Sequence, residues 1–183
     1  MERKGSGANP VSVSILGAKI QTDFFFQTLR IAGKECYMRL PVTPGHEFSG
    51  QVVKLGPDAG AHHKVSMGDL VVSEQIIACQ QCRFCQTGQY QVCPDHCIYG
   101  FHRETNGAMA EFMIFPAKAR VHRVPQHVSA QHAAFVEPLA CSIHGVELGN
   151  IQFNDVVVIA GCGPIGLGMV AGAKLKNPKL LIG

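Results

Sequence analysis

Short apolar segments rich in β-branched residues recur between residues 11 and 124, and glycine and proline separate them. Segments of this kind are typical of β-strands that bury one face. The pattern predicts strands over residues 11–19, 48–55, 70–77, 110–115 and 120–124. Polar residues 58–68 and the cysteine-rich residues 79–97 are expected to be loops. Many short strands between such turns indicate a β-rich domain.

The pattern changes near residue 129. Ser129 is a candidate helix N-cap, and residues 130–148 have helical composition with a bend expected at Pro138. The chain after residue 150 then predicts, in order, an apolar strand over 156–160, a glycine turn over 161–166, a helix over 165–176 and a strand over 179–182. Strand, turn, helix and strand in this order form the first βαβ unit of a doubly wound sheet.

These patterns divide the chain into a flexible tail at residues 1–10, a β-rich domain at 11–150 and an α/β segment at 151–183. Residues 156–173 carry no charge and approach the length of a membrane span. The stretch contains five glycines and Pro164, which favours a buried strand, a tight turn and a helix over a membrane helix.

Composition and net charge exclude several classes of protein. The chain has 183 residues, 46% hydrophobic and 16% charged, with a net charge of +3, which is typical of a globular protein. These values exclude a fibre, a disordered tail and a strongly basic nucleic-acid module. Residues 1–10 lack the apolar region of a signal peptide, so we expect a reducing, cytoplasmic setting. There, clustered cysteines bind metal more often than they form disulfides.

Four of the eight cysteines form the cluster Cys79-x2-Cys82-x2-Cys85-x7-Cys93. Four closely spaced thiolates are typical of a structural zinc site, which leaves no open position for a substrate. Two alternatives are four ordinary core cysteines and an iron–sulfur cluster. The bacterial iron–sulfur motif has a last gap of three residues, so the longer gap here favours zinc.

A second motif is Gly161-Cys162-Gly163-Pro164-Ile165-Gly166, a GxGxxG sequence between a predicted strand and a predicted helix. In that context Gly161, Gly163 and Gly166 are expected to let a dinucleotide pyrophosphate approach the helix N-terminus. The alternative is a glycine-rich packing turn. The acidic residue that such a site needs about 20 positions later, to hold the ribose, falls just past Gly183.

Two further sequences contain isolated charged or titratable groups. His46 and Glu47 follow Pro44-Gly45, and by themselves they indicate an ordinary histidine and a solvated carboxylate. Glu137 lies in the otherwise apolar segment FVEPLA. A charge in such a segment is either paired, bound to metal or at a helix edge that faces water.

Taken together and in this order, the motifs resemble the zinc-containing medium-chain alcohol and polyol dehydrogenases. The resemblance covers PGHEFSG, Gly68-Asp69, the four cysteines, NGAMAEF, EPLACSIH and VVVIAGCGPIGLG. It implies a β-rich GroES-like domain followed by the first βαβ unit of a truncated Rossmann domain of the doubly wound α/β class. The EPLA segment leans toward the sorbitol, erythritol and threonine dehydrogenase branches.

The resemblance implies the roles of individual residues. His46 is similar to a catalytic zinc ligand, Glu47 to a ligand or a group that supports the ligands, and Glu137 to the carboxylate that binds zinc directly or through water. In that chemistry a hydride passes from a zinc-bound alcohol or polyol to NAD or NADP. Neither a nucleic-acid nor a membrane partner is expected.

Two departures from the family pattern change the expected function. Relatives usually carry a zinc-binding cysteine upstream, where the best match here is Ile20 in Ile20-Gln21-Thr22-Asp23. The dinucleotide-binding domain is also expected to be incomplete. We therefore expect a fragment or short form that is inactive alone. The alternative is a non-catalytic zinc protein whose four-cysteine domain docks on a partner chain or a second copy that covers the exposed sheet.

Overall fold

The computed structural model describes residues 10–18 and 41–183. Residues 1–9 of the tail expected at 1–10, and Ile20, lie outside the described residues. The chain forms two compact units, one that ends at Ala134 and one that begins at Phe135. The boundary expected near residue 150 would fall after the first long helix of the second unit, whereas the observed division falls before that helix.

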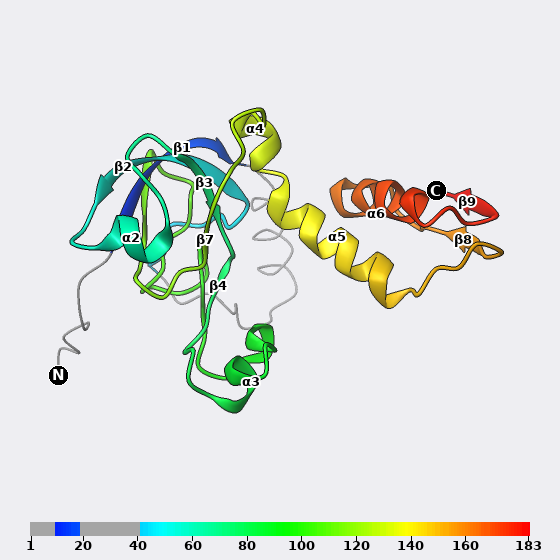
Figure 1. Cartoon of the computed structure of the whole chain (residues 1–183), viewed down its shortest axis with the longest axis horizontal. Coiled ribbons are helices and arrows are strands. Elements are labelled where there is room, and N and C mark those ends of the chain that lie inside the picture. Colours follow the sequence, from blue (N-terminus) through cyan, green and yellow to red (C-terminus); the bar gives the residue numbers. More distant parts are fainter. Residues whose placement is uncertain (1–9, 19–40) are drawn as a thin grey trace. The chain divides into compact units, whose positions relative to one another are not determined.

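The first unit contains an antiparallel sheet of five strands in the order β6-β1-β2-β3-β7 (Figure 1). The strands are β1 (Val11–Ala18), β2 (Phe48–Leu55), β3 (Leu70–Ser73), β6 (Phe112–Phe115) and β7 (Val121–Arg123). Each lies within a segment for which the apolar pattern predicts a strand. The register pairs Val13 with Val52 and Gly50 with Val71.

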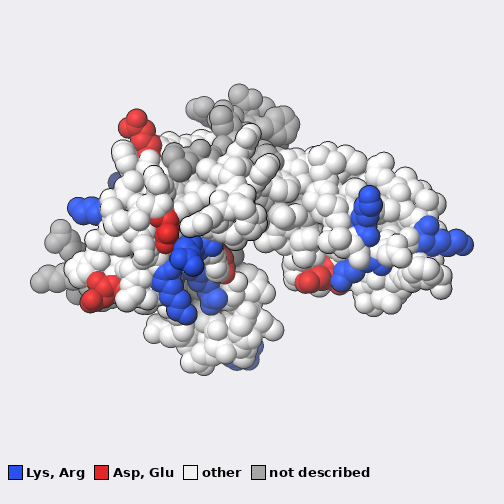
Figure 2. All heavy atoms as spheres, turned by 45° about the horizontal axis from the view of Figure 1, so that its top comes forward, with Lys and Arg blue, Asp and Glu red and all other residues white. Residues whose placement is uncertain are grey.

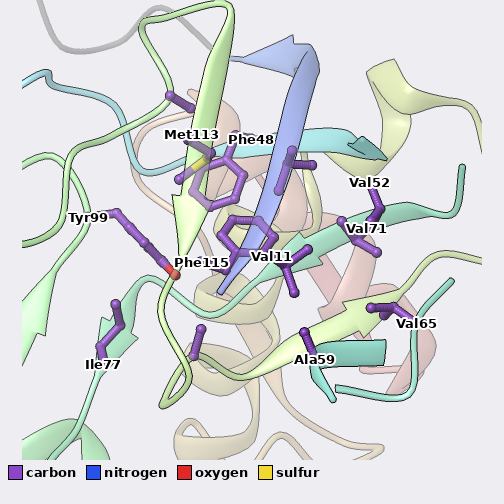
Figure 3. Packing of buried hydrophobic residues seen from close by; sticks show 13 residues of the cluster. Val11, Phe48, Val52, Ala59, Val65, Val71, Ile77, Tyr99, Met113 and Phe115 are labelled. Carbon is purple, nitrogen blue, oxygen red and sulfur yellow. The ribbon is translucent and has the colours of Figure 1, made fainter. Parts of the chain in front are cut away.

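Buried aliphatic and aromatic side chains form the core of this unit (Figure 3). The rings of Phe48, Tyr99 and Phe115 contact one another with centroids 5.6 to 5.8 Å apart. On β6, Met113 and Phe115 are buried while Phe112 and Ile114 are exposed, which is the alternation of a strand with one buried face. Aromatic pairs in these tilted and edge-on arrangements stabilise a core beyond the apolar area they bury.

Two expectations for this unit differ from the structure. The strand expected at 70–77 is divided into β3 and β4 (Ile76–Ile77), which belong to different sheets. β4 pairs with β5 (Cys97–Ile98), so the chain leaves the main sheet as a separate ribbon. The polar loop at 58–68 contains the short helix α2 (Ala59–His63), because Ala59 and His63 bury one side of it.

The ribbon leads to the cysteine-rich segment, which Figure 1 shows around the label α3. This segment contains the helix α3 (Arg83–Gln86) and the 3₁₀ turn η1 (Tyr90–Val92). We call residues 78–96 the cysteine lobe. The expectation of an irregular loop missed these two turns, which are too short to leave a periodic signal in the sequence.

Residues 130–148 form two helices, α4 (Ala130–Ala133) and α5 (Val136–Leu148), where one bent helix is expected. The Ser129 side chain accepts a hydrogen bond from the His132 N–H, which confirms the predicted N-cap. Pro138 lies in the first turn of α5, where a missing N–H disrupts no helical hydrogen bond. The chain therefore breaks before Pro138 and does not bend at it.

The second unit contains α5 followed by β8 (Val156–Val158), α6 (Pro164–Leu175) and β9 (Leu180–Ile182). β8 and β9 are parallel neighbours connected through α6, which confirms the predicted βαβ unit. Within the unit, α5 packs on α6, and the Ser142 hydroxyl donates to the Ile165 carbonyl at 2.9 Å.

No helix in the described part of the chain has the length and apolar character needed to cross a membrane. The face shown in Figure 2 carries Lys and Arg side chains with Asp and Glu side chains close by. That face shows no extended basic surface, in agreement with the small net charge.

Candidate metal and cofactor sites

The cysteine lobe brings the four predicted thiol ligands together. The Sγ atom of Cys85 lies 3.9 Å from that of Cys79 and 3.5 Å from that of Cys82, and the Sγ atoms of Cys82 and Cys93 are 3.8 Å apart. Four sulfur ligands about 2.3 Å from one tetrahedral ion would lie roughly 3.8 Å from one another. The cluster therefore has the dimensions of a closed four-thiolate zinc site.

Backbone hydrogen bonds prepare this cluster for metal. The N–H of Cys82 points at Cys79 Sγ and the N–H of Cys79 points at Cys93 Sγ, each at 3.4 Å. Donors from the Gln81 and Cys82 backbone lower the pKa of Cys79 to about 6. Removal from water raises the pKa of Cys85 to about 12. Cys79 therefore favours the thiolate that a metal binds, whereas Cys85 would release its proton when the metal binds. The closeness of the four sulfur atoms is what fits structural zinc.

Contacts with the loop before β7 attach the lobe to the rest of the unit. Gln80 Nε2 donates to the Lys118 carbonyl at 3.0 Å, and Lys118 Nζ donates to the Cys79 carbonyl at 3.5 Å. The guanidinium of Arg120 lies 3.8 Å from the ring centroid of Tyr90. These contacts hold both ends of the ligand segment.

His46 and Glu47 lie at the end of a loop that leads directly into β2. A segment about 60 residues later pairs with this loop: the N–H groups of Gly107, Ala108 and Met109 donate to the carbonyls of Thr43, Gly45 and Pro44, respectively, at 2.7 to 3.0 Å. The Asn106 side chain accepts the Thr43 N–H at 2.9 Å. The sequence NGAM thus supports PGHE through backbone hydrogen bonds.

Glycines make this close approach possible. A Cβ atom on Gly100 would lie 2.7 Å from Gly45 N, and one on Gly107 would lie 2.5 Å from the Pro44 carbonyl oxygen. Both distances are shorter than carbon can occupy without displacement of the neighbouring backbone. Gly100 and Gly107 therefore enclose the turn that positions His46.

The surroundings of His46 suit a metal ligand. Its ring packs against Phe101 with centroids 5.5 Å apart, and Nδ1 is buried with no hydrogen-bond partner among the described residues. Burial lowers the pKa of the imidazole, because the charged form loses its hydration. A buried, neutral imidazole with an unused nitrogen is the state in which histidine binds zinc.

Glu137 lies in the second unit, in the first turn of α5, and is half-buried. Its Oε1 lies 3.9 Å from the Cys141 thiol one helical turn later. Glu137 follows Ala134, the last residue of the first unit, by three positions. In the first unit, Ser49 Oγ donates to the Ala130 carbonyl at 2.6 Å and attaches α4 to β2 near Glu47.

The glycine motif lies between β8 and α6, as predicted. Gly163 is the N-cap of α6 and Pro164 follows at its first position, a typical helix start. Gly166 is buried, and a Cβ there would overlap the Gly161 carbonyl. A Cβ on Gly161 or Gly163 meets no atom within 4 Å, so this backbone is open to a ligand. Gly166 thus serves packing, and the backbone N–H groups at the start of α6 are available to an anion.

Sequence reasoning missed the residues that position His46. Asn106 and Gly107 belong to NGAMAEF, which contributes to the resemblance without indicating a role for either residue, and Gly100 and Phe101 belong to none of the motifs. Their roles depend on contacts between segments more than 50 residues apart. A glycine before an aromatic residue carries no signal by itself that could have identified them.

Comparisons with known proteins agree with this arrangement. Residues 8–126 match the family model "Alcohol dehydrogenase GroES-like domain". The chain is 57% identical over 141 residues to an erythritol/L-threitol dehydrogenase of Mycolicibacterium smegmatis, which is 77% of this chain and 39% of that protein. It is 36% identical over 143 residues to a sorbitol dehydrogenase of Halalkalibacterium halodurans, or 78% of this chain and 40% of that protein.

Among solved structures, galactitol-1-phosphate dehydrogenase of Escherichia coli is similar with a TM-score of 0.74 and 26% identity, over 99% of this chain and 49% of that one. The chain spans about two-fifths of the length of the curated relatives it matches. The family model ends before the βαβ unit, but the solved relative covers the matched domain and that unit together, so both share its fold. The chain belongs to the family of zinc-binding medium-chain alcohol and polyol dehydrogenases.

Proposed function

We propose that this chain is part of a dehydrogenase that transfers a hydride from an alcohol or polyol to NAD or NADP. His46, Glu47 and Glu137 would hold the catalytic zinc, and Cys79, Cys82, Cys85 and Cys93 a structural zinc. The observation that carries the proposal is the buried Nδ1 of His46, which has no hydrogen-bond partner among the described residues. A buried nitrogen of this kind is costly unless it has a partner, and a metal ion would provide one.

Chain connectivity supports the inclusion of Glu137. Ser49, two residues after Glu47, fixes α4 to β2, and Glu137 follows the last residue of the first unit by three positions. Three residues of chain reach at most about 10 Å. The carboxylate of Glu137 would supply the negative charge that a zinc ion with one neutral histidine ligand requires.

The proposed roles divide between metal, cofactor and protein. Zinc, when bound, supplies a Lewis acid that lowers the pKa of an alcohol oxygen, and NAD or NADP accepts the hydride. The neutral imidazole of His46 provides a nitrogen that needs no deprotonation at neutral pH. The open backbone at Gly161 and Gly163, at the N-terminus of α6, would bind the cofactor pyrophosphate. Gly166 would keep that turn tight.

A polyol is the proposed substrate class, because the relatives named for erythritol, L-threitol and sorbitol match about three quarters of this chain. The reducing, cytoplasmic setting belongs to the same proposal, since the cysteines must stay reduced to bind zinc. The chain spans about half the length of the solved relative, so we expect the 183 residues alone not to oxidise polyols.

A second candidate function is a zinc-binding protein without catalysis. It is favoured by Ile20, which stands where relatives usually carry a zinc-binding cysteine and cannot bind zinc. In this case the exposed side chains of Val156, Val158, Leu180 and Ile182 on β8 and β9 would contact a partner chain or a second copy.

Metal counting on the purified chain separates the two functions. Two zinc ions per chain, one lost on His46→Ala and the other on Cys93→Ser, would support the catalytic site. One zinc per chain, lost on Cys93→Ser and unaffected by His46→Ala, would support the second candidate. His127→Ala is the control, because His127 is exposed and belongs to neither cluster. Oxidation of sorbitol, erythritol or threonine by the 183 residues alone would contradict the expected inactivity.

A further inference from the structure

The segment after Cys93 connects the cysteine lobe to the loop that carries His46. It begins at a metal ligand of the lobe, passes through β5 and then forms a compact turn at residues 98–107, which we call the 98–107 loop. Hydrogen bonds close this loop: the Gly100 N–H donates to the Thr105 carbonyl at 2.9 Å, and the Thr105 hydroxyl donates to the Ile98 carbonyl at 2.9 Å.

Two histidines join the loop to the lobe. His96 Nδ1 is hydrogen-bonded to the carbonyl of Cys93, three residues earlier. The rings of His96 and His102 are in edge contact with centroids 6.3 Å apart. His102 is only 7% exposed, and its Nδ1 accepts the Ile98 N–H at 2.9 Å. His102 therefore contacts the lobe through His96 and fixes the start of the 98–107 loop through Ile98.

The other side of the same loop contacts the His46 turn. Gly100 lies against Gly45, Phe101 packs on the His46 ring, and Asn106 accepts the Thr43 N–H. The next three residues donate their N–H groups to the carbonyls of residues 43–45. The 98–107 loop is thus a continuous packed connection between a ligand of the four-cysteine site and His46.

We propose that the four-cysteine metal site positions His46 through the 98–107 loop, with His102 as the positioning residue. The ribbon of β4 and β5 has two residues in each strand, which is too short to hold the lobe by itself. The contacts with Lys118 and Arg120 hold the ends of the lobe, and metal binding adds order between them, because one ion fixes all four thiolates at once. The ordered Cys93 then fixes His96, His102 and the loop behind His46. This inference requires zinc in the lobe and does not require zinc at His46.

Amide hydrogen exchange tests the connection. We expect removal of zinc by a chelator to raise exchange at Ala108 and Met109 by about tenfold or more, because their bonds to residues 43–45 open with the loop. The ladder between Val13 and Val52 in the main sheet should stay protected. Faster exchange in the lobe alone, with residues 107–109 unchanged, would overturn the proposal.

A variant that keeps zinc in the lobe tests the proposed connection even if metal removal unfolds the whole unit. His102→Leu removes the acceptor of the Ile98 N–H and is expected to raise exchange at residues 107–109 and to shift the imidazole NMR signals of His46, with zinc still bound in the lobe. His102→Asn should restore both readouts, because its side-chain oxygen can replace Nδ1 as acceptor.

The control is His127→Leu, which makes the same chemical change at an exposed histidine. The role of His102 would be overturned if the His46 signals of His102→Leu stayed at their wild-type positions. It would also be overturned if His102→Asn behaved like His102→Leu. Zinc content of His46→Ala is measured separately, so failure of the proposed catalytic site would not be mistaken for failure of this connection.

Discussion

Gly100 lies directly against Gly45, so close that a Cβ atom on Gly100 would be 2.7 Å from the backbone nitrogen of Gly45. Gly100 also has a φ of +77°, in the region that residues other than glycine avoid. The contact joins the turn after β5 to the turn before β2, and His46 is the next residue after Gly45. Two features that are far apart in the sequence therefore set the position of one candidate ligand.

We expect Gly100→Ala to lower the free energy of unfolding of the first unit by about 2–4 kcal/mol, from strained φ and from backbone overlap. The control is Gly88→Ala, where φ is +80° but a Cβ would meet no atom within 4 Å. That variant should cost only about 1–2 kcal/mol. Denaturant unfolding measures both values, and equal losses would show that the contact with Gly45 contributes nothing.

Gly168 on α6 makes a similar close contact inside the second unit. A Cβ there would overlap the hydroxyl of Ser142 on α5. Helix propensity alone predicts that Gly168→Ala stabilises α6 by about 1 kcal/mol. Overpacking of the α5–α6 contact would cost about 1–3 kcal/mol. We expect the cost of overpacking to exceed the gain in helix propensity, so thermal unfolding of Gly168→Ala should show a net loss of stability. A net gain would contradict the close packing of α5 on α6.

The pKa of Cys79, lowered from 9.0 to about 6, has a measurable consequence in the metal-free protein. Between these values the folded chain has lost a proton that the unfolded chain keeps. This group therefore stabilises the fold as pH rises from about 6 to about 9, and the contribution is lost on acidification through pH 6. Thiolate absorbance should show a step near pH 6.

The step should be absent from Cys79→Ser and present in Cys162→Ser, because Cys162 is an exposed cysteine outside the cluster. If the wild type, Cys79→Ser and Cys162→Ser all showed the same absorbance step, the step would belong to a group other than Cys79. Zinc should abolish the step, since a bound thiolate no longer takes up the proton in this range.

Tyr90 gives an independent test of the contacts around the lobe. Burial and the carboxylate of Glu74 raise its pKa, while the positive charge of Arg120 lowers it. Arg120→Leu should therefore raise the pKa of Tyr90 further, and Glu74→Gln should lower it. The raised pKa keeps Tyr90 protonated in the fold, so its contribution to stability decreases as pH rises above the ordinary value near 10.

Tyrosinate absorbance follows this titration, and Tyr90→Phe identifies which part of it belongs to Tyr90. Arg123→Leu is the matched control, because Arg123 is exposed on β7, three residues after Arg120. A shift of equal size in Arg123→Leu would show that the effect is general charge and not the contact between Arg120 and Tyr90.

Local chemistry explains what could be predicted from the sequence. The four cysteines lie within 15 residues, so their spacing alone indicates one tetrahedral site. The strand, glycine turn, helix and strand from residue 156 onward also depend on neighbours along the chain. The Ser129 cap is determined in the same way, because capping requires only the next three residues.

Packing between distant segments decided the rest. The apolar run 70–77 has the composition of one strand, but β3 pairs with β7 while β4 pairs with β5, and these competing partners divide it. The support of His46 depends on hydrogen bonds between residues 43–45 and 106–109 and on the contact of Gly100 with Gly45. Residue types and spacing by themselves determined the four-cysteine cluster and the βαβ unit. Only the tertiary structure determined what holds His46 in place, because non-local contacts form where complementary surfaces pack and leave no periodic pattern in the sequence.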